Sequence, residues 1–181
     1  MRSLHNDSST KIDMTRTRLA SAAGSALLVF FGFAPHNATG FSVGQEVDAC
    51  SLLSVADASK ALEQSSQPGK RMVESSPSGC IWSADPKMSD SSRRVAVNTH
   101  TPRAFTFAKT PAIKTITVEP VAGLGDEAFY QIYPKDSPFI WVKKGNNAIS
   151  IRLMGTKANR FSLEQEKAKE LTLAKAAIAK L

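Results

Sequence analysis

The clearest fold signal in this chain is the segment Phe139-Ile-Trp-Val-Lys-Lys-Gly-Asn-Asn-Ala-Ile-Ser-Ile-Arg-Leu153. At its centre, Lys144-Gly-Asn-Asn147 supplies the Gly and Asn that a tight turn needs for positive φ, between two β-rich runs. In the second run, apolar residues at 149, 151 and 153 alternate with polar residues at 150 and 152. The segment therefore predicts an antiparallel hairpin with one apolar face and one wet face.

Three further strands are predicted from β-rich runs at residues 80–84, 93–99 and 128–133. Residues 65–79 contain Ser, Pro and Gly without an apolar period, so we expect a loop there. Three prolines exclude a long helix and a central strand from residues 101–120, which leaves room for a short helix over 104–109. The expected sheet has about five strands.

A helix is predicted on each side of these strands along the chain. Residues 50–62 form a short helix that Ser54 caps, with Asp57 placed favourably in its first turn. Residues 162–181 form the second helix. The predicted fold class is therefore α+β: an antiparallel twisted sheet of about five strands, with the N-terminal and C-terminal helices packed on one face.

The C-terminal helix has the strongest helical pattern in the chain. Ser162 and Gln165 form a capping box at its start. Its polar side is expected to include Glu166. The predicted apolar stripe is Ala168, Leu171, Ala174, Ile178 and Leu181.

Residues 1–40 have the pattern of a leader with a cleavable signal peptide. Two arginines precede an apolar run over 19–34, and small residues follow it. We expect cleavage near Gly40, with either Met1 or Met14 as the start. The apolar run is shorter than the ~20 residues of a spanning helix, so a retained membrane anchor is the less favoured alternative.

Cleavage at this site leaves residues 41–181 as a single α+β domain that is secreted or periplasmic. Residues 1–40 hold four of the 23 basic and two of the 16 acidic residues, so 41–181 carries 19 against 14, a net charge of +5. The basic residues are scattered, which favours a solvated surface over a nucleic-acid interface. We expect a monomer that binds no nucleic acid and has no stable membrane span after cleavage.

The chain has two cysteines, Cys50 and Cys80, and both follow the leader. A lone cysteine pair in an exported domain favours a structural disulfide over redox chemistry. The predicted bridge ties the first helix to the first strand across the loop over 65–79.

The sequence predicts no catalytic, cofactor-binding or metal-binding residue. After residue 40 the single histidine is His100, and two cysteines with one histidine do not complete a structural zinc site. No Gly-x-Ser-x-Gly motif marks a nucleophile. Asp126 and Glu127 are adjacent, so on a strand their carboxylates point to opposite faces. Gly123-Leu-Gly125 predicts a turn and lacks the pattern of a phosphate loop.

Aromatic and basic residues in the predicted strands form a candidate ligand or partner face. Aromatic side chains on a sheet can line a groove, and basic neighbours would attract an anionic envelope component. The alternatives are core packing for the aromatic residues and protection of a sheet edge for the lysines. The candidate residues are Trp82, Arg94, Tyr130, Trp141, Lys143 and Arg152.

Four motifs together resemble a family of small exported bacterial domains. They are Asp48-Ala-Cys-Ser-Leu-Leu, Ser78-Gly-Cys-Ile-Trp82, Gly123-Leu-Gly-Asp-Glu-Ala-Phe129 and Val142-Lys-Lys-Gly-Asn146. As a set they resemble the DUF3558-like lipoproteins of actinobacteria over most of residues 45–181, although this chain lacks their lipidation box. The resemblance implies an α+β domain with a curved antiparallel sheet, in some cases akin to the Mog1/PsbP shape. It implies no catalytic residue, because that family has no established activity.

The sequence favours a noncatalytic exported domain that binds a partner protein or an envelope ligand through its sheet. Two alternatives stay open. One is a small extracytoplasmic hydrolase whose active site the sequence does not locate, and the other is a structural envelope component.

Overall fold

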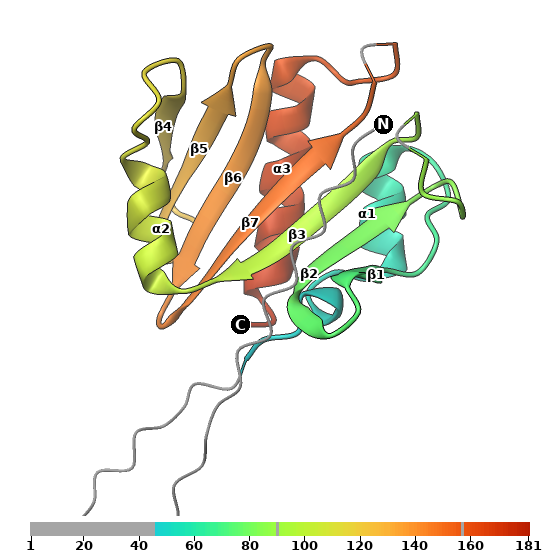
Figure 1. Ribbon diagram of the computed structural model, residues 1–181, viewed down its shortest axis with the longest axis horizontal. Helices are drawn as coiled ribbons and strands as arrows, with labels where there is room; N and C mark the ends of the chain where they lie inside the picture. Colours follow the sequence, from blue (N-terminus) through green and yellow to red (C-terminus); the bar gives the residue numbers. More distant parts are fainter. Residues whose placement is uncertain (1–45, 90, 157) are drawn as a thin grey trace, which may run out of the picture. The chain divides into compact units, whose positions relative to one another are not determined.

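The computed structural model of this protein describes residues 46–181, except 90 and 157, as a sheet with helices on both faces (Figure 1). The predicted leader, residues 1–40, lies outside the described residues. Within them, seven strands pair antiparallel in one sheet, in the order β1-β2-β3-β7-β6-β5-β4. In chain order, the elements are η1 (Ala49–Ser51), α1 (Val55–Leu62), β1 (Lys70–Val73), β2 (Ser76–Ser83), β3 (Arg94–His100), α2 (Pro102–Lys109), β4 (Thr117–Val121), β5 (Glu127–Tyr133), β6 (Ser137–Lys144), β7 (Asn147–Met154) and α3 (Leu163–Ile178).

The α+β class is confirmed, but the described sheet has seven strands where about five were expected. The two additional strands, β1 and β4, form its edges. All four residues of β1 are exposed, so this strand has no alternation for the sequence to reveal. β4 contains Pro120, which has no N–H to donate, and an edge strand tolerates this residue. These two edge strands were missed because β1 has no alternation of buried and exposed residues and because the proline in β4 argued against a strand.

The hairpin of β6 and β7 forms as predicted. The two strands pair up to Lys144 and Asn147, and Gly145 and Asn146 form the loop between them. Gly145 has φ +58°, a conformation that side chains with a Cβ rarely adopt. Asp126 holds this loop, because its Oδ2 accepts a 2.6 Å hydrogen bond from the backbone N of Gly145.

Helices α1 and α3 cover one face of the sheet and lie behind it in Figure 1. Each begins with a capping box, formed by Ser54 and Asp57 in α1 and by Ser162 and Gln165 in α3. The side chains between these helices and the sheet form the main hydrophobic core. The prediction that the N-terminal and C-terminal helices share one face is therefore confirmed.

The buried side of α3 differs from the predicted apolar stripe. Ala168 is exposed, whereas Glu166 and Glu170 are 1% and 0% exposed. Arg160 donates two hydrogen bonds to the Glu166 carboxylate, Nε to Oε1 at 3.0 Å and Nη2 to Oε2 at 2.6 Å. A pairing of this kind offsets the desolvation of the two charges. The prediction was wrong here because a helical pattern assigns glutamate to solvent unless its partner is known.

Glu170 lies beside the end of β7, beyond the point where β7 pairs with β6. The ladder between the two strands reaches Ile140 and Ile151 and stops before Leu153. The backbone N of Leu153 donates instead to Glu170 Oε1 at 2.9 Å. Burial raises the pKa of the Glu170 carboxyl well above its ordinary value. A helix side chain thus takes the place of a strand partner inside the core.

The predicted disulfide is present and joins Cys50 in η1 to Cys80 in β2, with their Cα atoms 5.0 Å apart. The bridge spans 30 residues and ends on the fully buried Cys80. A structural disulfide is consistent with an extracellular protein. Among the described residues, no helix is both long enough and apolar enough to cross a membrane.

Candidate functional site

The face of the sheet opposite α1 and α3 carries α2 at one end, in front of the strands in Figure 1. We call it the open face. Its positions alternate along each strand with core residues, as the strand register requires. From the three central strands β3, β6 and β7, the open face receives Arg94, Ala96, Asn98, His100, Phe139, Trp141, Lys143, Ala148, Ser150 and Arg152.

Four of the six predicted face residues lie on the open face: Arg94, Trp141, Lys143 and Arg152. The other two, Trp82 and Tyr130, belong to the covered face and leave the candidate site. Trp82 is 1% exposed, and Tyr130 is 6% exposed with its hydroxyl donating to Lys167 O at 2.5 Å.

The physical reason for this division is the register of the strands. Trp82 lies opposite Val95, and Tyr130 lies opposite Ile140, so both point toward the helices with the apolar core. Sequence alternation orders residues within one strand, but it does not say how one strand's faces align with those of the next.

An aromatic row crosses the open face from α2 toward β3. The ring centroids of Phe105 and Phe129 are 5.0 Å apart, those of Phe129 and Trp141 are 6.2 Å apart, and those of Trp141 and His100 are 4.4 Å apart. Stacking of this kind holds each ring in one orientation. Trp141 is therefore a fixed surface, although its Nε1 is buried and has no hydrogen-bond partner among the described residues.

His100 ends this row and is held by Ser150. The distance between His100 Nε2 and Ser150 Oγ is 2.8 Å. Burial lowers the pKa of the His100 imidazole, which favours its neutral form at neutral pH. The histidine thus contributes a flat, uncharged ring to the open face.

Arg152 supplies a partly buried positive charge on this face. Its guanidinium carbon lies 4.4 Å from the centroid of the Phe139 ring, and Nη2 donates to Ser137 Oγ at 2.8 Å. Its Nε is buried without a hydrogen-bond partner, and none of the ion pairs among the described residues includes Arg152. Burial, followed by the nearby charge of Arg160, lowers the pKa of Arg152. Arg152 thus forms no ion pair among the described residues, although the charges of Glu170 and Glu166 act on it from a longer distance and oppose this lowering of its pKa.

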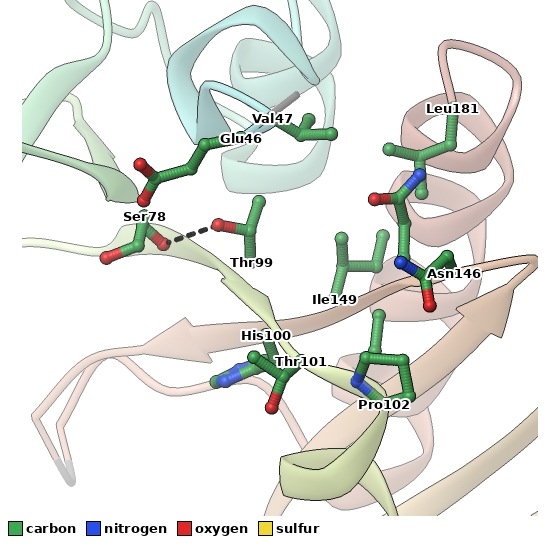
Figure 2. Close-up of a pocket in the computed structure, with 12 residues that line it drawn as sticks. Glu46, Val47, Ser78, Thr99, His100, Thr101, Pro102, Asn146, Ile149 and Leu181 are labelled. Atoms are coloured by element: carbon green, nitrogen blue, oxygen red, sulfur yellow. Dashed lines mark hydrogen bonds between the residues drawn. The ribbon is translucent and has the colours of Figure 1, made fainter. Parts of the chain in front are cut away.

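A cavity of about 390 Å³ opens beside His100 at one end of the sheet (Figure 2). Thr99 Oγ1 donates to Ser78 O at 3.4 Å across one wall of this cavity. Most of its polar lining is hydroxyl and amide. The hydroxyl and amide residues of this lining are Ser78, Thr99, Thr101, Asn146 and Asn147, and His100 and the carboxylate of Glu46 complete the polar lining. His100 contributes both to the cavity and to the aromatic row of the open face.

The geometry does not support nucleophilic catalysis by the His100 and Ser150 pair. Ser150 is 3% exposed and sits within the pairing of β7 with both neighbours, so its hydroxyl is closed to an incoming substrate. Among the described residues, no carboxylate forms a hydrogen bond that would orient His100. The contact between the two side chains is best explained as structural.

The neighbouring carboxylates Asp126 and Glu127 serve separate structural contacts. Asp126 binds the hairpin loop, and Glu127 pairs with Lys109 of α2. No group of three or more His, Cys, Asp or Glu side chains in the described part of the chain could hold a metal ion.

Sequence reasoning considered His100 as a possible zinc ligand and missed its place beside Trp141. The alternation of residues 94–100 could have placed His100 on the same face as Arg94. The neighbouring Trp141 could not be found in this way, because it requires the order β3-β7-β6. The cavity requires in addition that the hairpin loop and residues 99–101 meet at one end of the sheet.

A scan of protein-family models, a search of curated proteins and a search of solved structures found no significant match for the chain. The resemblance to DUF3558-like lipoproteins therefore stays a prediction that rests on the motifs alone.

Proposed function

We propose that this protein is a noncatalytic exported domain that binds an anionic group of a partner protein or envelope ligand through its open face. The observation that carries the proposal is Arg152, a partly buried guanidinium that forms no ion pair among the described residues. Burying part of a cation costs free energy that an anion can offset. The planar guanidinium also favours bidentate recognition of carboxylate or phosphate.

The surroundings of Arg152 support the same conclusion. Lys143 adds a second cation to the open face, toward the hairpin end of β6, and the acid opposite it in the register, Glu127, is engaged by Lys109. Trp141 offers a rigid aromatic ring on the same face. A basic face with rigid aromatic surface fits a ligand that carries negative charge and some apolar area.

Export is the second part of the proposal. It rests on the leader pattern of residues 1–40, with cleavage near Gly40, and on the disulfide between Cys50 and Cys80. The domain over 41–181 would then act as a monomer outside the cytoplasm, in the manner that the DUF3558-like resemblance implies.

Isothermal titration calorimetry with poly-L-glutamate as the probe tests the open face directly. We expect the full chain to bind the probe and the Arg152→Met variant to bind it roughly tenfold or more weakly, since truncating a charged hydrogen-bond partner removes this much affinity. Lys175→Met is the matched control, because Lys175 is exposed on α3 and loses the same charge. Equal loss in both variants would indicate attraction by net charge alone, and absence of binding would reject an anionic ligand of this kind.

A further inference from the structure

A second surface, separate from the open face, is formed by α2 and the residues that follow it up to Lys114. Two large apolar side chains stand out there, because Phe107 is 63% exposed and Ile113 is 59% exposed. Burying either side chain against a binding partner would be favourable by about 1.5–3 kcal/mol. We call residues 102–114 the α2 ridge.

The outward position of Phe107 follows from the packing of α2. Phe105 is 1% exposed and packs on Phe129 of the sheet. Two residues along an α-helix correspond to a rotation of about 200°, so Phe107 must point away from the sheet when Phe105 points into it. The exposure is thus a consequence of how the helix is seated, and no rotation of α2 buries both rings.

The charge of the α2 ridge is entirely positive. Residues 101–116 contain Arg103, Lys109 and Lys114 and no aspartate or glutamate. The guanidinium of Arg103 lies 5.4 Å from the centroid of the Phe107 ring, one helical turn away. Lys109 pairs with Glu127, whereas no ion pair among the described residues engages Arg103 or Lys114.

We infer that the α2 ridge docks on an anionic lipid surface, with Phe107 and Ile113 entering the interface and Arg103 and Lys114 contacting lipid phosphates. Apolar side chains flanked by cations that form no ion pair among the described residues have the chemistry of an interfacial membrane contact. Two separated side chains bury far less than the ~800 Å² per partner of a standard protein interface. A bilayer, in contrast, accepts single side chains at the depth of its headgroups.

Tryptophan quenching by brominated lipid tests this contact at the residue itself. Phe107→Trp and Ile113→Trp variants of the full chain are mixed with vesicles of equal parts phosphatidylglycerol and phosphatidylcholine with brominated acyl chains. The emission of the unsubstituted chain is subtracted. We expect both new tryptophans to be quenched, and vesicles of phosphatidylcholine alone to quench them much less, since the cations need an anionic surface.

Val73→Trp on the edge strand β1 is the matched control, because Val73 is 59% exposed, as Ile113 is. Its tryptophan should stay unquenched, which separates docking by the ridge from attachment of the chain elsewhere. Adding Lys114→Gln to Phe107→Trp should weaken the vesicle partition roughly fivefold, the effect of one cation near an anionic surface.

Equal quenching at positions 73 and 107, or none at 107, would overturn the inference. A blue shift of the added indole emission in Phe107→Trp that grows with protein concentration without lipid would also overturn it, in favour of a second copy of the chain. None of these outcomes bears on the proposed binding of an anionic ligand to the open face, because Arg152 takes no part in the experiment.

Discussion

The two faces of the sheet differ in how their buried polar groups are paired. On the covered face, Arg160 binds the buried Glu166, and Tyr130 donates its hydroxyl to a backbone oxygen of α3. On the open face, Arg152 Nε and Trp141 Nε1 are buried without hydrogen-bond partners in the described chain, and on the covered face Glu170 Oε2 is the corresponding case. An unpaired buried donor costs about 1–3 kcal/mol, so these two donors lower the stability that the open face contributes. The covered face holds the main core, whereas the open face holds a smaller core of Phe105, Phe129 and Ala148 beside α2 and is the face that we propose to bind a ligand.

The largest effect we expect separates the two tryptophans of the chain. Trp82→Ala should lower the free energy of unfolding by about 3–5 kcal/mol, because Trp82 is 1% exposed in the main core. Trp141→Ala should lower it by only about 1 kcal/mol, the size of an aromatic pair contribution. Urea unfolding followed by far-UV circular dichroism measures both. Equal destabilisation would mean that Trp141 also supports the fold and that the contrast between the faces is false.

The next effect separates two arginines. Arg160→Met leaves the buried Glu166 without its cation and should cost about 3 kcal/mol of unfolding free energy, as the loss of one partner of a buried ion pair does. Arg152→Met removes a charge that has no carboxylate partner in the described chain, so it should change the unfolding free energy by less than ~1 kcal/mol. The same urea titration compares the two variants. A strongly destabilised Arg152→Met would show that the open face carries structural charge.

A smaller effect appears in the pH dependence of stability. Burial raises the pKa of Glu170 in the folded state above its unfolded value, so the folded state binds this proton more tightly. The unfolding free energy should therefore fall as the pH rises from the ordinary carboxyl range through the raised pKa. Glu170→Gln, which cannot titrate, should lose this decline.

Glu164→Gln is the control for that experiment, because Glu164 is exposed on the same helix. Urea unfolding between about pH 4 and about pH 8 gives the comparison. If Glu170→Gln retained the slope of the original chain while Glu164→Gln lost it, the assignment of the titration to the buried carboxyl would be wrong.

The features that sequence predicted well are those determined by neighbouring residues. The hairpin around Gly145 and the capping boxes at Ser54 and Ser162 depend on local hydrogen bonds and on local φ values. The disulfide could be predicted because the chain offers a single pairing of its two cysteines.

The features that were missed depend on segments far apart in the chain. Glu166 looks like a solvent-facing residue until Arg160 is placed beside it. Trp82 and Trp141 look alike in sequence, and only the register of β2 on β3 and of β6 on β7 sends them to opposite faces. The sequence therefore predicted that a face of the sheet would carry basic and aromatic residues. Which residues lie on that face could be known only from the order and register of the strands.

The indole N–H signals of Trp82 and Trp141 in a ¹H–¹⁵N correlation spectrum test the central claim most directly, because they report one on each face of the sheet. Trp82→Phe identifies which signal is which. On titration of the labelled full chain with poly-L-glutamate, the account predicts a progressive shift of the Trp141 signal and none of the Trp82 signal. A shift of Trp82 alone, or binding of the probe without movement of Trp141, would contradict the assignment of ligand binding to the open face.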